Sequence, residues 1–228
     1  MDSPLIIALD LEPNEALKFV KKIDPSDCQL KIGNQLFTSQ GPDIVKKVQD
    51  KGFKVFLDLK YHDIPNTVYL AVSSALDLDV WMLNVHTAGG EEMLRSATQA
   101  KLESNKETIL LGVTVLTSLD DNSLSNIGFG LPSAELAIKL AKLAKKNSLD
   151  GVVCSAEEVK NIKEKCGKDF IAVTPGIRYK GDSQDQRRVN TAKSAIEQGS
   201  DYLVIGRPVT KSPDPVKSIF KILEEIKS

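Results

Sequence analysis

The sequence contains little that would support a disulfide-bonded or zinc-binding protein. Its 228 residues include three cysteines, Cys28, Cys154 and Cys166, and two histidines, His62 and His86. The cysteines form no C-x-x-C pair, and an odd number of unpaired cysteines is typical of a reducing cytoplasm. A structural zinc site takes four ligands, mostly cysteine and histidine. We therefore expect a cytoplasmic protein with free thiols and no metal site.

Charge of one sign and long apolar runs are also missing. The 30 Lys and Arg residues nearly balance the 31 Asp and Glu residues, so the net charge is −1. This excludes a broad positive field for nucleic acid or an anionic membrane. No apolar stretch is long enough to span a bilayer, and no basic segment precedes the first apolar run. We therefore expect no nucleic-acid partner and no membrane association. The G-x-G-x-x-G and P-loop motifs are absent as well, so we expect no cofactor.

Short apolar runs alternate with amphipathic segments along the whole chain. The expected strands are 5–10, 28–33, 54–60, 81–86, 108–117, 151–155, 170–175 and 202–206. The expected helices are 13–23, 41–51, 65–77, 90–104, 133–147, 156–166 and 213–227. Eight strand-then-helix units in one chain of this length predict a (β/α)₈ barrel that forms a single domain over residues 1–228. A doubly wound open sheet is the alternative, since periodicity does not prove closure.

A cluster of charges follows the third apolar run. Residues 58–63 read DLKYHD, and alternation along a strand places Asp58 and Lys60 on the same face as Phe56. Burying an isolated charge costs free energy, but carboxylates and an ammonium packed together keep one another ionised. Such clusters are typical of active sites. The plainer interpretation is a structural ion pair at a strand end. Asp63 supplies the second carboxylate of the cluster.

Polar residues also follow most of the other apolar runs. In barrel enzymes the chemistry lies at the carboxyl ends of the strands. The residues at these ends are Asp10, Lys31, Asp58, Lys60, His86, Thr117, Ser118, Ser155, Arg178 and Arg207. A ring of polar groups that each follow an apolar run favours a common cavity over a solvated surface.

Glycine and arginine together follow the last two strands. Gly176 and Arg178 come after the seventh run, and Gly206 and Arg207 come after the eighth. Barrels often bind phosphate at these two loops, where glycine lets backbone N–H groups approach an anion and arginine supplies a permanent charge. We expect a phosphomonoester ligand here, with the polar segment 179–190 as a lid.

Seven segments, in the same order, resemble the orotidine 5′-phosphate decarboxylase family of the bacterial type. They are 8–10 (ALD), 30–33 (LKIG), 58–67 (DLKYHDIPNT), 113–118 (VTVLTS), 173–178 (VTPGIR), 185–188 (DQRR) and 204–210 (VIGRPVT). The resemblance implies a cofactor-free barrel that converts orotidine 5′-monophosphate to uridine 5′-monophosphate and CO₂, the last step of de novo pyrimidine synthesis. By this resemblance Asp10 and Lys31 hold the ribose hydroxyls.

The resemblance also assigns the chemistry and the partner. Asp58 and Lys60 would face the scissile carboxylate, with Lys60 as the proton donor to C6 of the pyrimidine. The family is homodimeric, and Asp63 and Thr67 would reach into the partner subunit's site. Catalytic roles are thus expected for Lys60, Asp58 and Asp63.

The remaining substrate contacts are likewise implied by the resemblance. Thr117 would contact the pyrimidine, with Ser118 adjacent and not separable from it. The phosphate would be bound by Arg178, Gln186, Gly206 and Arg207, with Gln186 coming from the lid.

Two alternative functions remain open. Related barrels that process sugar phosphates, such as hexulose-phosphate synthase, share D-x-K-x-x-D but use Mg²⁺, and they place a glutamate at the end of the second strand, where this chain has Lys31. Magnesium prefers carboxylate oxygens, so a lysine there favours the metal-free reaction. A catalytically silent phosphonucleotide-binding barrel would need the Gly/Arg pairs but not Asp58, Lys60 and Asp63 together.

Overall fold

Eight parallel strands form a closed barrel in the computed structural model, which describes residues 3–177 and 190–227. The strands pair in chain order, and β1 pairs with β8 to close the sheet. They are β1 (Leu5–Ala8), β2 (Gln29–Gly33), β3 (Val55–Tyr61), β4 (Met82–His86), β5 (Ile109–Val113), β6 (Gly151–Val153), β7 (Ile171–Pro175) and β8 (Tyr202–Ile205). The expected (β/α)₈ barrel is confirmed, and the open sheet is excluded.

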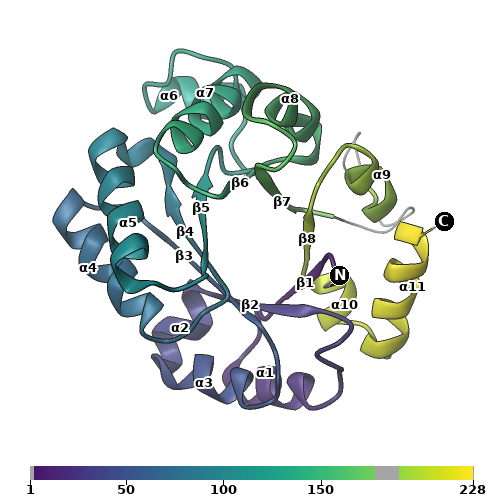
Figure 1. Ribbon diagram of the computed structural model, residues 1–228. Helices are drawn as coiled ribbons and strands as arrows, with labels where there is room; N and C mark the ends of the chain where they lie inside the picture. The colour runs from purple at the N-terminus through teal and green to yellow at the C-terminus, as the bar shows by residue number, and fades with distance from the viewer. Residues whose placement is uncertain (1–2, 178–189, 228) are drawn as a thin grey trace.

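Helices surround the barrel on its outer side (Figure 1). They are α1 (Pro13–Val20), α2 (Asn34–Gln40), α3 (Asp43–Gln49), α4 (Pro65–Leu76), α5 (Glu91–Ser104), α6 (Asp121–Asn126), α7 (Ser133–Lys146), α8 (Ala156–Cys166), α9 (Ala192–Glu197), α10 (Arg207–Thr210) and α11 (Pro215–Lys227), with a 3₁₀ turn, η1 (Thr87–Gly89). No helix in the described ranges has the length and apolar character needed to cross a membrane.

All seven expected helices are present, whereas α2, α6, α9 and α10 were not expected. These four are short, with at most seven residues each, and lack a long apolar period. The helix α8 illustrates a correctly expected start. Ser155 and Glu158 form a capping box, in which each side chain satisfies a backbone N–H at the first turn.

The fifth strand is shorter than expected. It ends at Val113, whereas the apolar pattern predicted a strand through Thr117. Beyond Val113 the Thr114 N–H and hydroxyl both donate to the Val153 carbonyl, and the Leu119 N–H then donates to the Leu116 carbonyl and closes a turn. Apolar residues in this turn pack on a small separate cluster instead of on the barrel. Thr117 therefore lies on a loop above the barrel.

Apolar side chains fill both sides of the sheet. On β1, Leu5 and Ile7 belong to the core between the barrel and the helices, while Ile6 and Ala8 belong to the core inside the barrel. The inner core also contains Phe56, Met82, Leu111, Val173 and Val204. This inner layer fills the barrel below the carboxyl ends of the strands, and charged side chains stand above it.

The barrel interior leaves no room for a side chain at Gly151. A Cβ there would lie 2.1 Å from the Ile171 carbonyl oxygen on β7. Since that atom belongs to the backbone, the two strands would have to separate. We expect Gly151→Ala to destabilise the protein by about 2 kcal/mol or more, measured by urea unfolding.

Gly130→Ala is the matched control, because an added Cβ there meets no atom within 4 Å. We expect that variant to unfold at nearly the wild-type urea concentration. Equal unfolding midpoints for the two variants would contradict the close approach of β6 and β7.

Candidate active site

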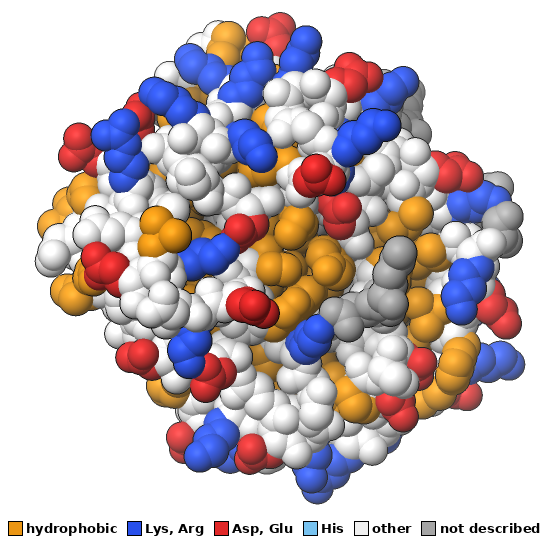
Figure 2. All heavy atoms as spheres, viewed as in Figure 1, with side chains coloured by type: hydrophobic (Ala, Val, Ile, Leu, Met, Phe, Trp, Pro, Cys, Tyr) orange, Lys and Arg blue, Asp and Glu red, His pale blue; other side chains and the backbone are white. Residues whose placement is uncertain are grey.

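A cavity of about 620 Å³ opens at the carboxyl ends of the strands. Its lining includes the apolar residues Ala8, Phe56 and Val204. Figure 2 shows hydrophobic side chains gathered in the middle of this face. Pockets of this size suit ligands as large as a drug molecule or a nucleotide. The polar groups that line it come from five different strand ends.

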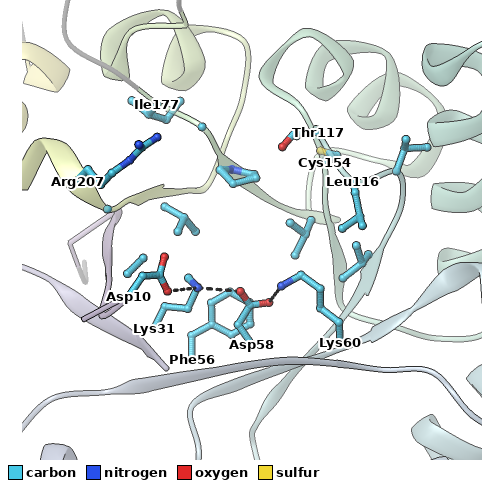
Figure 3. Close-up of a pocket in the computed structure, with 18 of the residues that line it drawn as sticks. Asp10, Lys31, Phe56, Asp58, Lys60, Leu116, Thr117, Cys154, Ile177 and Arg207 are labelled. Carbon is cyan, nitrogen blue, oxygen red and sulfur yellow. Dashed lines mark hydrogen bonds and ion pairs between the residues drawn. The ribbon is translucent and has the colours of Figure 1, made fainter. Parts of the chain in front are cut away.

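Four charged residues of alternating sign form a row along one wall (Figure 3). Asp10 follows β1, Lys31 lies on β2, and Asp58 and Lys60 lie on β3. The Lys31 Nζ is 3.4 Å from Asp10 Oδ1 and 2.9 Å from Asp58 Oδ2. The Lys60 Nζ is 2.7 Å from Asp58 Oδ1. The structure therefore brings together four of the expected site residues.

Asp58 and Lys31 are both largely buried, so their charges depend on one another. Burial alone would raise the pKa of Asp58, but the nearby Lys31 and Lys60 ammoniums outweigh it, and the pKa is lowered. Burial alone would lower the pKa of Lys31, but attraction to Asp58 and Asp10 raises it. Asp58 is therefore ionised and Lys31 protonated at neutral pH.

Asn84 is a site residue that the sequence analysis missed. It lies in the middle of β4, is 0% exposed, and its Nδ2 donates to Asp58 Oδ1 at 2.7 Å. Its Oδ1 accepts the Lys60 backbone N–H at 2.8 Å. The only signal in the sequence is a single amide in an otherwise apolar run, 82–86 (MLNVH).

Arg207 also lines the cavity, on the side of Asp10 and away from Lys60 (Figure 3). It begins α10 directly after β8, and Gly206 beside it also lines the cavity. Gly176, after β7, has a φ of +81°, and among residues 3–177 and 190–227 no atom would contact a Cβ added there within 4 Å, its chain neighbours aside. A left-handed backbone next to open space suits glycine and lets an anion approach the main chain. Arg178 and Gln186 lie outside the described residues, as does the expected lid 179–190 except for Asn190.

The loop after β5 contributes Thr117 to the cavity, between Leu116 and the wall formed by β6. Ser118 is exposed and is not among the residues that line the cavity. The sequence could not distinguish Thr117 from Ser118 as a cavity residue, whereas in the structure Thr117 lines the cavity and Ser118 does not.

Asp63 and Thr67 lie away from this cavity. Both are exposed, and Asp63 Oδ1 accepts the Ile64 N–H at 2.6 Å, just before α4. Within the described part of the chain, the Lys60 ammonium pairs with Asp58 and no ion pair joins it to Asp63. The expectation that Asp58, Lys60 and Asp63 pack together therefore does not hold within one chain. The second acid of the array is Asp10, reached through Lys31.

The two histidines lie beside the array and do not line the cavity. Their ring centroids are 5.4 Å apart. Burial lowers the pKa of His86, and the neighbouring His62 and Lys60 lower it further. His86 at neutral pH is therefore uncharged.

No group of three or more His, Cys, Asp or Glu residues suited to a metal ion occurs in residues 3–177 and 190–227. The carboxylates of Asp10 and Asp58 both face the Lys31 ammonium, which occupies the position between them.

A closed parallel barrel with paired charges and an arginine at the carboxyl ends of its strands defines the class of (β/α)₈-barrel enzymes. Comparison with known sequences then gives the family. The model of the orotidine 5′-phosphate decarboxylase / HUMPS family matches residues 3–222, and the chain belongs to this family.

Individual relatives are similar over their full length. The chain is 53% identical to the orotidine 5′-phosphate decarboxylase of Glaesserella parasuis, covering 99% of this chain and 100% of that protein. It is 49% identical to the enzyme of the same name from Escherichia fergusonii, with 99% and 94% covered. The crystal structure of orotidine 5′-phosphate decarboxylase from Lactobacillus acidophilus superposes with a TM-score of 0.89 at 41% identity, with 100% of both chains covered.

The depressed pKa of Asp58 predicts a pH dependence of stability. The unfolded chain binds a proton at the ordinary aspartate pKa, whereas the folded chain binds it only at lower pH. The stability contributed by the ionised carboxylate is therefore complete above the ordinary value, and it is lost as the pH falls through the folded value. We expect Asp58→Asn to remove this part of the slope in plots of unfolding free energy against pH.

The measurement is urea unfolding between about pH 3 and pH 6, a range that spans the ordinary aspartate pKa. Asp169→Asn, at an exposed position, is the control and should keep the wild-type slope. A wild-type slope in Asp58→Asn would show that the carboxylate is not held ionised.

Proposed function

We propose that this chain decarboxylates orotidine 5′-monophosphate to uridine 5′-monophosphate and CO₂, the last step of UMP biosynthesis, without a cofactor. The observation that supports it most is the row Asp10–Lys31–Asp58–Lys60, in which two ammoniums and two carboxylates alternate at the cavity wall. Relatives with about half of the sequence in common carry the name of this enzyme.

The charges of the cavity match the two ends of this substrate. The nucleotide carries a carboxylate on its pyrimidine and a phosphate at the far end of its ribose. Arg207 offers a guanidinium on one wall, and Lys60 offers an ammonium on the other. A phosphate at Arg207 would direct the pyrimidine toward Thr117 and Lys60, and Asp10 and Lys31 would face the ribose hydroxyls. The resemblance to the family assigns Arg178 and Gln186 to the same phosphate, and we propose that role for them.

Lys60 would serve as the proton donor. When the C6–carboxylate bond breaks, CO₂ leaves and its bonding electron pair stays on C6 of the ring. The Lys60 ammonium would stabilise this pair and then transfer a proton to C6, which leaves a neutral amine that regains its proton from water. The 2.7 Å contact with Asp58 directs the ammonium to one position before the reaction begins. Preorganised charge of this kind is commonly the largest contribution to catalysis.

Asp58 would act on the ground state. Its carboxylate stays ionised because Lys31, Lys60 and Asn84 all donate to it. A substrate carboxylate bound beside it would be repelled, and this repulsion would end as neutral CO₂ departs. A rate enhancement near 10¹⁷-fold corresponds to about 23 kcal/mol, so this effect would have to combine with proton donation and with phosphate binding.

Lys31 argues against the Mg²⁺-dependent sugar-phosphate reaction. A divalent ion at the strand ends would need the oxygens of Asp10 and Asp58. The Lys31 Nζ already lies within 3.4 Å of one and 2.9 Å of the other. The raised pKa of Lys31 keeps this cation charged, so it would repel the metal.

A homodimer with shared active sites would explain the position of Asp63 and Thr67. Both are exposed, neither is among the residues that line the cavity of their own chain, and both lie near the start of α4. Large apolar side chains are exposed at α4 and on its neighbour α5. Ile64, just before α4, is 66% exposed, Leu70 on α4 is 56% exposed, and Leu102 on α5 is 70% exposed. A second copy seated on α4 and α5 would bury these side chains and bring Asp63 and Thr67 to the other cavity.

The direct test is the loss of orotidine monophosphate absorbance in the presence of purified protein and EDTA. We expect the wild type to turn over the nucleotide with EDTA present, because no step uses a metal. Lys60→Ala should lower kcat by about 10³-fold or more while retaining uridine monophosphate binding, because it removes both the proton donor and a cation.

Lys47→Ala, on the outer helix α3, is the matched control and should have wild-type activity. Activity that requires added Mg²⁺ would reject the metal-free reaction in favour of the sugar-phosphate enzymes. Lys60→Ala with more than a tenth of the wild-type kcat would reject the proton-donor role.

Shared sites predict complementation between two inactive variants. Lys60→Ala and Asp63→Ala should each be nearly inactive alone. If Asp63 acts in the partner's cavity, a mixed dimer has one site with both defects and one intact site. After subunit exchange at equal concentrations, activity should recover to about a quarter of the wild-type value, since half of the dimers are mixed.

The control is a mixture of Lys60→Ala with Asp58→Asn, two residues of the same cavity, which should stay inactive. Equal recovery in both mixtures, or none in either, would contradict a site completed by Asp63 of the second subunit.

A further inference from the structure

Strand pairing is irregular where Lys60 enters the cavity. Leu57 pairs with Leu83 and Tyr61 pairs with Val85, so three residues of β3 face a single residue of β4. Such bulges redirect side chains and are common next to active sites. The single residue of β4 is Asn84.

The backbone at Lys60 is left-handed, with a φ of 53°. Three other non-glycine residues in the described part of the chain share this property: Asp79, Asn105 and Ser148. Each of those three lies in a turn between a helix and the next strand, and none lines the cavity. Lysine is disfavoured in this conformation, and a strained residue persists only where its surroundings hold it.

The Asn84 side chain supplies contacts that hold it. One end of the amide accepts the Lys60 backbone N–H at 2.8 Å, and the other end donates to Asp58 Oδ1 at 2.7 Å. That same carboxylate oxygen receives the Lys60 ammonium at 2.7 Å. One buried amide thus joins the backbone of the lysine to the carboxylate that binds its side chain.

We infer that Asn84 is a positioning residue, which fixes the left-handed backbone of Lys60 and the orientation of Asp58 so that the ammonium points at the reacting carbon. The inference rests on the proposed decarboxylation and concerns the same site. Asn84 would act through Lys60 and Asp58, and its loss should lower kcat far more than it raises KM.

Asn84→Leu removes both hydrogen bonds and keeps a side chain that branches at Cγ with the same number of heavy atoms. We expect it to lower kcat by about 100-fold, the order of loss that follows from a misplaced reacting group, with KM changed by less than about threefold. Asn147→Leu is the control. Asn147 is also buried and hydrogen-bonded, but it lies at the end of α7, away from the cavity. It should lower the melting temperature and leave kcat unchanged.

Asn84→Asp gives a readout that a purely structural role would not produce. The new side chain still accepts the Lys60 N–H, but when ionised it repels Asp58 in place of donating to it. The like charge of Asp58 raises the pKa of the introduced carboxyl group, and its protonated form can donate the missing hydrogen bond. The ratio of variant to wild-type kcat should therefore rise as the pH falls from about 8 to 5.5.

A wild-type kcat in Asn84→Leu, or a pH-independent ratio for Asn84→Asp, would overturn the inference. If the wild type itself failed to decarboxylate the nucleotide, the proposed function would be rejected, and a crystal structure of Asn84→Leu would decide the inference separately. Lys60 keeping a positive φ and its contact with Asp58 in that crystal would overturn it. An extended Lys60, or an ammonium turned away from Asp58, would support it.

Discussion

The site depends on one carboxylate that stays ionised although it is almost fully buried. Burying an isolated charge is costly, and Asp58 avoids that cost because two ammoniums and one amide donate to its two oxygens. A buried ion pair seldom adds net stability compared with apolar packing. The ion pairs of Asp58 contribute orientation instead, because the carboxylate fixes where the Lys31 and Lys60 ammoniums lie before any ligand binds. Charges placed in advance need no rearrangement as the reaction proceeds.

The barrel makes this arrangement possible by bringing separate strand ends to one place. Asp10, Lys31 and Asp58 come from three consecutive strands that pair in parallel. Lys31 pairs with Ala8 and Phe56, two residues before the aspartates, and its long side chain reaches both carboxylates. Arg207 comes from the far end of the chain, yet β8 pairs with β1 and so brings it to the same cavity, next to the strand that leads to Asp10. The sheet therefore sets the spacing of the charges.

The eight strands, the seven expected helices and most of the charged site residues could be predicted from the sequence, because each apolar run contains a buried strand and most polar residues of the site follow one directly. The four short helices could not, since they lack a long apolar period. Alternation correctly placed Asp58 and Lys60 together, but it could not reveal the left-handed backbone at Lys60, which depends on pairing with β4. Asn84 was missed for the same reason, since its role comes from contacts across strands. Thr117 was expected on a strand because the apolar pattern continues into a turn that packs on a separate cluster. The roles proposed for Asp63 and Thr67 require a second chain, which no pattern within one sequence describes.

The apolar layer inside the barrel limits the routes by which CO₂ and the nucleotide product can leave the cavity. Ile6, Phe56, Met82 and their neighbours fill the barrel beneath the charged row, so a molecule in the cavity has to leave at the carboxyl ends of the strands. A nucleotide with its phosphate at Arg207 and its ring near Lys60 and Thr117 would lie over this apolar layer. Carbon dioxide released there would have to escape past the nucleotide, along the same route by which the product later departs. Carbon dioxide would then leave before the nucleotide. Until it has left, only rapid protonation of C6 would prevent CO₂ from adding back to the ring.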